Sequence, residues 1–310
     1  MTEKNIAYKA FDKDMQCSGF QFEVGTHYEH NGKVEPCKSG FHACKNPLDV
    51  WNYYQINSRY AIVEIAGDVV DSGSDSTVVC SNISIVQEIT LTELINHSVK
   101  YMLNECYDKL AGDDSNLAAS GHYSKLAASG DDSKLAASGR YSDLAASGDD
   151  SDLAASGHNS KLAASGHYST LAASGNYSDL AASGYNSKLA ASGHNSKLAA
   201  SGHNSKLAAS GHYSKLAASG HYSKLVASGN YSDLAASGYN SKLVASGKNS
   251  ICMAAGYAST AQVGENGVIV LPYYDDIRTR VAVGYVGENG IEPNVEYKVN
   301  NNGIFEKVNM

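Results

Sequence analysis

The pattern of apolar and polar positions is dominated by one nine-residue unit, G-x-x-S-x-L-A-A-S, which occurs sixteen times within residues 112–255. In a typical unit, 121–129, Leu126 alternates with Lys125 and Ala127, which is the period of a β-strand. Leu is the one large apolar residue of nearly every unit, so we expect it in the core and the variable fifth position in water. A glycine every nine residues, at about 1 kcal/mol each, argues against a helix.

Two units are needed to form one coil, because nine residues supply only one strand and one corner. The Asp-Asp pairs 113–114, 131–132 and 149–150 recur at this spacing of eighteen residues. The pattern predicts a mainly β protein, built around a parallel β-solenoid of about eight 18-residue coils, roughly 38 Å long at about 4.8 Å per strand. We expect the corner glycines to supply positive φ, and the serine at position four to hydrogen-bond to its stacked copies.

The segments on either side of the repeats have ordinary patterns. Residues 1–111 predict an α+β domain with strands over 5–11 and 60–66, a helix over 46–54 that Asn46 caps, and a helical segment over 91–110. Residues 256–310 predict a small β cap with four strands, which are expected over 268–271, 280–286, 295–299 and 304–308. The predicted domains are therefore 1–111, 112–255 and 256–310.

Composition limits the cellular compartments and the kinds of site that we expect for this chain. The formal net charge is −8, and no apolar stretch approaches the about 20 residues of a membrane span. Residues 1–14 are mostly polar, so we expect no signal peptide. The six cysteines are scattered, which favours reduced structural thiols. Cys17, Cys37, Cys44 and His42 lack the spacing of a zinc finger or ribbon. We therefore expect a cytoplasmic protein with no metal, no cofactor and no membrane partner.

Charge is distributed unevenly along the repeats: the net charge is −5 over residues 112–156 and +6 over 157–255. At two units per coil, four lysines fall on one face in consecutive coils, and we expect them to bind an acidic partner: Lys188, Lys206, Lys224 and Lys242. The acidic end has six corner carboxylates, Asp113, Asp114, Asp131, Asp132, Asp149 and Asp150. This polarity also predicts a homodimer in which the acidic end of one copy meets the basic end of another.

The seventh position of each unit, Ala in most and Val at 226 and 244, would supply a small apolar stripe to such a dimer. Two further readings of the lysines stay open. They can be a solvated face that prevents edge-to-edge aggregation, or they can bind nucleic acid.

Two sequence signatures in the first domain resemble a group of uncharacterised bacteriophage and prophage proteins. These are Gly-Phe-Gln-Phe-Glu-Val at 19–24 and Gly-Phe-His-Ala-Cys-Lys-Asn-Pro-Leu-Asp at 40–49, followed by Ser-Gly repeats and a small β terminus. The resemblance implies a protein made in the cytoplasm of an infected bacterium. With no catalytic set in the sequence, we expect a non-enzymatic protein that binds a host macromolecule, to counter defence or to redirect a host enzyme. The alternative is a structural spacer in a phage particle or surface.

The first domain also looks like the NAD-binding half of ADP-ribosyltransferases. The similarity lies in Tyr8-Lys9-Ala10, Gly40-Phe41-His42 and Val63-Glu64-Ile65, with Glu88 as the late acidic residue. Lys9 stands where that family has His or Arg, and His42 where it often has Tyr. The resemblance therefore implies a degenerate transferase domain, in which His42 and Glu88 are weak catalytic candidates.

Overall fold

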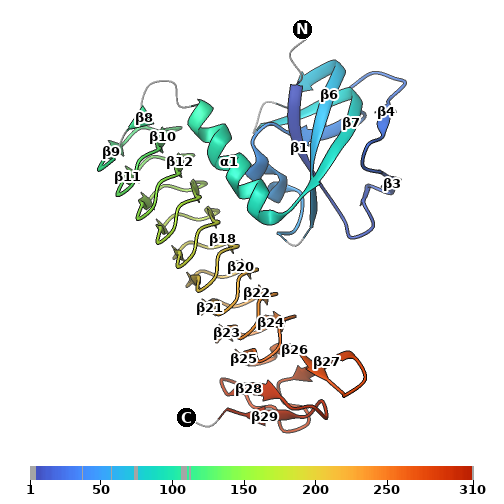
Figure 1. Cartoon of the computed structure of the whole chain (residues 1–310), viewed down its shortest axis with the longest axis vertical. Coiled ribbons are helices and arrows are strands. Elements are labelled where there is room, and N and C mark those ends of the chain that lie inside the picture. The colour runs from blue at the N-terminus through green and yellow to red at the C-terminus, as the bar shows by residue number, and fades with distance from the viewer. Residues whose placement is uncertain are drawn as a thin grey trace. The chain divides into compact units, whose positions relative to one another are not determined.

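The computed structural model describes residues 5–36, 38–56, 58–72, 76–105, 110–111 and 113–308. The chain divides into two compact units, Met1–Tyr101 and Met102–Met310. Figure 1 shows the elements of each unit.

The first unit is built on an antiparallel sheet that closes on itself. Strands pair in the order β4-β7-β5-β1-β6, and β7 also pairs with β6. The closed ring leaves an interior filled by Phe11, Phe22 and Ile83. The strands are β1 (Asn5–Phe11), β4 (His27–Glu29), β5 (Phe41–Cys44), β6 (Arg59–Asp71) and β7 (Thr77–Ile89), with a hairpin of β2 (Gln16–Cys17) and β3 (Phe20–Gln21) beside them.

Two helical elements begin in this unit, where the sequence predicts them, and the second continues past its last residue, Tyr101. The first is a 3-10 helix, η1 (Pro47–Asn52), in which the Asn46 side chain accepts the Leu48 amide at 3.2 Å. The second is α1 (Leu91–Glu105), which starts with a capping box because Thr90 and Glu93 exchange hydrogen bonds. The predicted helical segment over 91–110 is thus confirmed to residue 105, and residues 106–109 lie outside the described residues.

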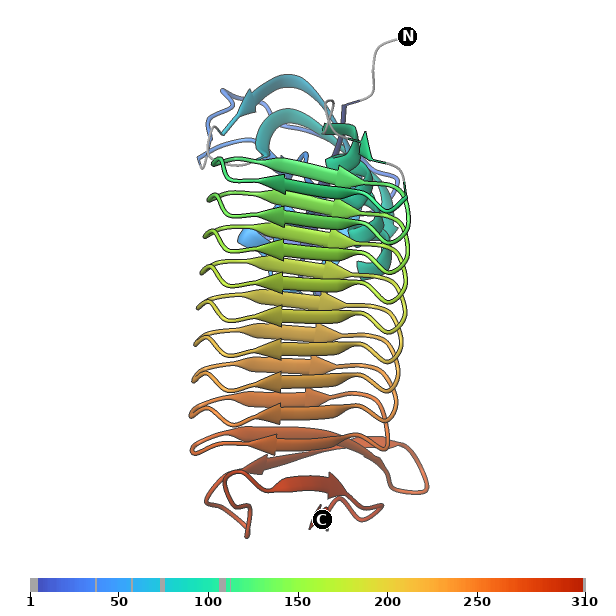
Figure 2. The same cartoon turned by 90° about the vertical axis from the view of Figure 1, so that its left-hand side faces the viewer.

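The repeats form a parallel β-solenoid of about nine turns over residues 116–270, as the sequence predicts in kind. Alternate strands belong to two sheets, which we call the odd sheet and the even sheet after their strand numbers, and Figure 2 shows the stacked coils. The parallel strands of the odd sheet are β9 (Asn116–Ala119), β11 (Lys134–Ala137), β13 (Asp152–Ala155), β15 (Thr170–Ala173), β17 (Lys188–Ala191), β19 (Lys206–Ala209), β21 (Lys224–Ala227), β23 (Lys242–Ala245) and β25 (Thr260–Val263). Those of the even sheet are β8 (Leu110–Ala111), β10 (Lys125–Ala128), β12 (Asp143–Ala146), β14 (Lys161–Ala164), β16 (Asp179–Ala182), β18 (Lys197–Ala200), β20 (Lys215–Ala218), β22 (Asp233–Ala236), β24 (Ile251–Ala254) and β26 (Val268–Tyr274).

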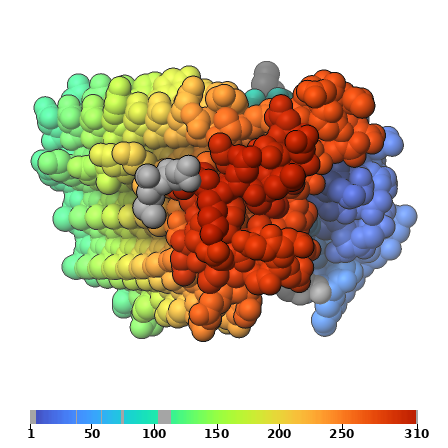
Figure 3. Space-filling view, turned by 90° about the horizontal axis from the view of Figure 1, so that it is seen from below, coloured from blue at the N-terminus to red at the C-terminus, as the bar shows by residue number. Residues whose placement is uncertain are grey.

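The leucines lie between the sheets, as expected, and the alanines two residues later fill the rest of that space. Each residue pairs with the one eighteen positions on, so that Leu189 lies beside Leu207 and Leu207 beside Leu225. The parallel pairing continues past the last recognisable repeat, because β25 and β26 still place Val263 and Ile269 inside. Three antiparallel strands then cover the final coil (Figure 3): β27 (Thr279–Tyr285), β28 (Glu296–Val299) and β29 (Phe305–Lys307).

The corners of the solenoid correct two expectations from the sequence. The residue with positive φ is the third of each unit, such as Tyr222 or Asn204, and not the glycine. The glycine is required by close approach, since a Cβ on Gly202 would lie 2.0 Å from the carbonyl oxygen of Gly184. The serine hydroxyl at position four bonds mainly within its own unit, as where Ser205 Oγ donates to the Gly202 carbonyl at 2.8 Å. It bonds to a stacked copy in the last coils, where Ser250 Oγ accepts the Ser232 amide and Ser259 Oγ accepts the Ser241 amide, each at 3.1 Å.

Candidate functional site

The predicted lysines lie on the odd sheet, in register on consecutive coils. Lys188 pairs with Lys206, Lys206 with Lys224 and Lys224 with Lys242, at the strand spacing of about 4.8 Å. Lys188, Lys206 and Lys224 are exposed, and among the described residues no carboxylate lies within 4.0 Å of their Nζ atoms. We call the outer surface of the odd sheet the lysine face.

The fourth lysine differs from the other three. Lys242 Nζ lies 2.5 Å from Glu296 Oε2 of the C-terminal strand β28, and Thr260 Oγ1 donates to the other oxygen of Glu296 at 2.5 Å. Burial would raise the pKa of Glu296, but the hydrogen bonds from Lys242 and Thr260 outweigh it and hold that pKa below its usual range. The ladder available to a partner therefore has three lysines, and the cap neutralises the fourth.

The corner aspartates lie at the turns that lead into the same odd sheet, at the opposite end of the solenoid. The first residue of each pair links neighbouring coils, because its carboxylate accepts a backbone amide of the next coil. The amide of Asp149 donates to Asp131 Oδ1 at 2.8 Å, and that of His167 donates to Asp149 Oδ1 at 2.6 Å. The second residues, Asp114, Asp132 and Asp150, have positive φ and line a polar groove of about 690 Å³ that extends to Lys188. The structure thus places both predicted charge clusters on one side of the solenoid, without bringing them together.

The second position of the repeat has a role that the sequence analysis missed. Its side chain accepts the backbone amide of the residue eighteen positions on, through Oδ1 of Asp or Asn or through Nδ1 of His. His203 Nδ1, for instance, accepts the His221 amide at 2.9 Å, and Asn176 Oδ1 accepts that of His194 at 2.8 Å. The signal was present, since this position is mostly Asp, Asn or His, which all carry an acceptor at the δ position.

The same position builds a column of stacked rings beside the lysines. At the turns that lead into the odd sheet, the ring centroids of His167 and Tyr185 lie 4.9 Å apart, those of Tyr185 and His203 5.4 Å, and those of His203 and His221 4.8 Å. Tyr185, His203 and His221 belong to the units that carry Lys188, Lys206 and Lys224. Each exposed lysine therefore shares its unit with one stacked ring.

On the other side of the lysines, the seventh and ninth positions line an open groove of about 1030 Å³. Its floor is alanine from Ala118 to Ala208, with Val226 at one end. This is the small apolar stripe that the sequence predicts. The lysine face thus combines a basic ladder, an aromatic column and an apolar groove in parallel rows.

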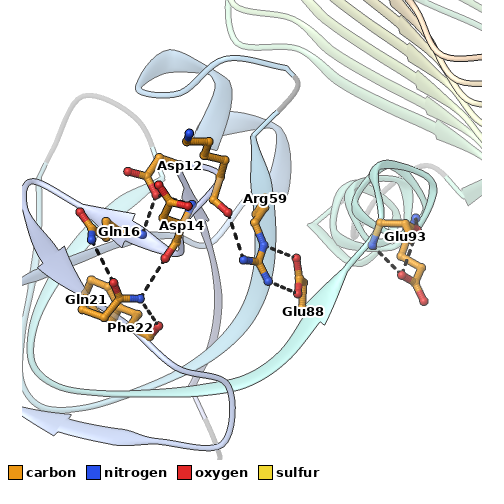
Figure 4. A network of polar contacts seen from close by, with 10 residues as sticks. Asp12, Asp14, Gln16, Gln21, Phe22, Arg59, Glu88 and Glu93 are labelled. Atoms are coloured by element: carbon orange, nitrogen blue, oxygen red, sulfur yellow. Dashed lines mark hydrogen bonds and ion pairs between the residues drawn. The ribbon is translucent and has the colours of Figure 1, made fainter. Parts of the chain in front are cut away.

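The weak catalytic candidates of the first unit are not brought together. His42 on β5 lies opposite Val79 of β7, whereas Glu88 lies nine residues further along β7, about 30 Å along the strand. Both oxygens of Glu88 accept from Arg59 at 2.6 Å, which lowers the pKa of Glu88 (Figure 4). Burial and the charge of Lys9 lower the pKa of His42. His42 and Glu88 therefore belong to separate sites.

The cysteines and histidine weighed as zinc ligands are partly assembled. Cys17, His42 and Cys44 line one cavity, and Cys37 lies outside the described residues. Over the part of the chain that the structure describes, no three His, Cys, Asp or Glu side chains are grouped so as to hold a metal ion. Cys17, Cys44, Cys80 and Cys252 form no disulfide bond.

Comparison with known protein families gives a match for the first part of the chain. The family described as "Domain of unknown function (DUF7666)" matches residues 5–97, which comprise the closed sheet and the first seven residues of α1. No curated protein and no solved structure matches the chain. No helix within the described ranges is long and apolar enough to cross a membrane.

Proposed function

We propose that this chain is a non-enzymatic interaction protein of phage origin, which uses its lysine face to bind an acidic host protein in the bacterial cytoplasm. The observation that carries the proposal is the uninterrupted run of Lys188, Lys206 and Lys224. Like charges directly opposite one another on adjacent strands destabilise a sheet. An acidic partner would relieve that cost, and its capture would counter a host defence or redirect a host enzyme.

The lysines alone would hold a partner weakly, because an exposed ion pair contributes only about 0.2–1 kcal/mol. The alanine groove and the ring column add apolar area that a partner can bury at about 25 cal/mol per Å². The fitting partner therefore presents a row of carboxylates with an apolar ridge beside it.

A pull-down from bacterial lysate with the full chain as bait tests the proposal. The test variant changes Lys188, Lys206 and Lys224 together to Glu. The control changes Lys13, Lys33 and Lys38 to Glu, which alters the net charge equally at exposed positions of the first unit. We expect wild type and control to retain a stoichiometric host protein and the test variant to lose it. High salt should also release this protein from the wild type, because salt screens exposed charges. Equal capture by the test variant, or no stoichiometric partner, would refute the proposal; loss on nuclease treatment would point to nucleic acid instead.

A second candidate is self-association, which one observation favours. The Asp column and the Lys column lie on the same side of the solenoid and share the eighteen-residue period, so two antiparallel copies can match carboxylates to ammonium groups rung by rung. Light scattering should then show a homodimer at low salt that dissociates at high salt. The triple Lys→Glu variant should be monomeric and folded. A monomer at every salt and protein concentration contradicts this candidate.

A further inference from the structure

The first unit contains a cavity that the proposed function does not use. It has a volume of about 410 Å³ and lies among β1, β2, β5 and the residues that follow η1. Its polar lining includes Lys9, Cys17, His42 and Tyr54, and Ala10, Ala43 and Val50 form an apolar side. Small-molecule sites in proteins have this size and mixed lining.

Lys9 is the unusual residue of the cavity, because its side chain is buried without a carboxylate. It is 4 % exposed, and its Nζ donates to the carbonyl oxygen of His42 at 2.8 Å and lies 5.5 Å from the ring centroid of Phe22. No carboxylate lies within 4.0 Å of this ammonium among the residues that the structure describes. A buried charge needs a compensating one nearby.

The Cys17 sulfur lies in the same cavity and interacts with the charge of Lys9. Its Sγ lies 2.6 Å from Tyr54 Oη. Burial would raise the pKa of Cys17, but the charge of Lys9 and the hydrogen bonds that Cys17 makes with Tyr54, Lys9 and Ser18 bring that pKa below its usual range. Burial raises the pKa of Tyr54, so the phenol keeps its proton and donates it to the sulfur. By contrast, burial raises the pKa of Cys80 to about 11.

We propose that this cavity is an acyl-acceptor site, in which the Cys17 sulfur takes a small acyl group from a thioester. The Cys17 thiolate attacks the carbonyl carbon and forms the new C–S bond, while the carbonyl π electrons move to oxygen. Tyr54 Oη, which contacts the sulfur before the attack, and the Lys9 ammonium, which lines the same cavity, donate to that oxygen as the charge moves to it. Collapse breaks the donor's C–S bond, and the released thiolate takes a proton from water. No oxidant or reductant is involved.

The other ionisable groups around the sulfur do not replace Lys9 in this role. Burial and Lys9 lower the pKa of His42, so its ring is neutral near pH 7. Asp12 and Cys44 act on Tyr54 and raise its pKa further. Cys80, on β7, is also within the field of Lys9, but burial dominates there. Tyr53 and Thr77 line the cavity, and their hydroxyl oxygens lie 3.1 Å apart.

Two probes on the full-length protein test the site: iodoacetamide for the thiolate, and S-butyryl-N-acetylcysteamine for acyl transfer, both read by peptide mass spectrometry. We expect Cys17 to be alkylated at least tenfold faster than the other cysteines, with a pH midpoint below the about 8.5 of a free thiol. We also expect a butyryl mark on Cys17 that hydroxylamine removes. Cys17→Ser should abolish both products, and Cys252→Ala, in the interior of the solenoid, should leave both in place.

The Lys9→Met and Tyr54→Phe variants test the role of the two neighbours. Each should slow both reactions, and Lys9→Met should move the alkylation midpoint toward that of a free thiol. If Lys9→Met does not fold by circular dichroism, Tyr54→Phe decides the point. An ordinary midpoint for wild-type Cys17 would overturn the thiolate. Fast alkylation without any butyryl mark would overturn the acyl acceptor. Neither result depends on the lysine face, so this site and the proposed function can fail separately.

Discussion

The two sheets of the solenoid bury the same residue types, but their outer surfaces differ: charges of opposite sign alternate on one sheet, and like charges are adjacent on the other. On the even sheet the fifth position alternates for most of its length, as Lys125, Asp143, Lys161, Asp179, Lys197, Lys215 and Asp233, so most charges lie beside an opposite one. On the odd sheet the same position is occupied by lysine in four consecutive coils. Both sheets bury the same Leu and Ala. The difference shows that folding requires Leu and Ala at the inward positions of both sheets, but does not dictate which charge stands at the outward fifth position.

The largest expected effect tests the shared interior. Leu207 of the odd sheet and Leu198 of the even sheet are both fully buried, so Leu207→Asp and Leu198→Asp should each destabilise by about 4 kcal/mol or more, because an unpaired carboxylate enters the core. Thermal or urea unfolding by circular dichroism measures this. A much smaller cost on one sheet would break the claim that the two interiors are equivalent.

The serine at position four gives the next effect. Ser205 Oγ in the odd sheet and Ser196 Oγ in the even sheet donate to glycine carbonyls at 2.8 and 3.0 Å. Replacing either by Ala leaves a buried carbonyl unpaired and should cost about 1–3 kcal/mol. Ser201→Ala is the control, because the buried Ser201 hydroxyl has no partner among the described residues and its removal should cost nothing. An equal loss for Ser201→Ala would contradict this account.

The Glu296 carboxylate of the cap makes a pH-dependent contribution to the free energy of unfolding, at the end of the lysine ladder. The pKa of Glu296 is lowered in the folded protein, so the carboxylate adds stability above its unfolded pKa of about 4.3 and loses it as the pH falls through the lower folded value. The contribution of this partly exposed pair is at most about 1 kcal/mol. The melting temperature of the wild type should therefore exceed that of Glu296→Gln at pH 7. The two melting temperatures should become equal at a pH below the folded pKa of Glu296. A constant difference at both values would contradict the assigned role.

The smallest effect has opposite signs on the two sheets. Lys206 lies between Lys188 and Lys224, so Lys206→Glu should stabilise by about 0.5 kcal/mol. Lys161 lies between Asp143 and Asp179, so Lys161→Glu should destabilise by a similar amount. The two melting temperatures, measured at low salt, should diverge and then approach each other as salt is added. Shifts of the same sign would mean that neighbouring charges do not control these faces.

The repeat by itself determined the coil length, the buried Leu and Ala, and the lysine register, because each depends only on neighbours at a fixed sequence spacing. Periodicity also predicted the strands of the last segment, and β1 and the first half of β6 in the first segment, but it missed β7 and the short strands β2 to β5. It did not reveal that the third residue takes positive φ, or that Gly202 is needed for its approach to Gly184. Those features depend on how one coil contacts the next.

Only the tertiary structure decided the contents of the first unit's cavity. Lys9, Cys17 and Tyr54 come from β1, β2 and the turn after η1, and no periodic pattern connects them. The sequence resemblance paired His42 with Glu88, whereas the sheet register separates them and gives Glu88 to Arg59. A repeat encodes contacts between nearest neighbours in a stack. In a closed antiparallel sheet, the meeting of distant side chains is set by strand order and register, which no local pattern specifies.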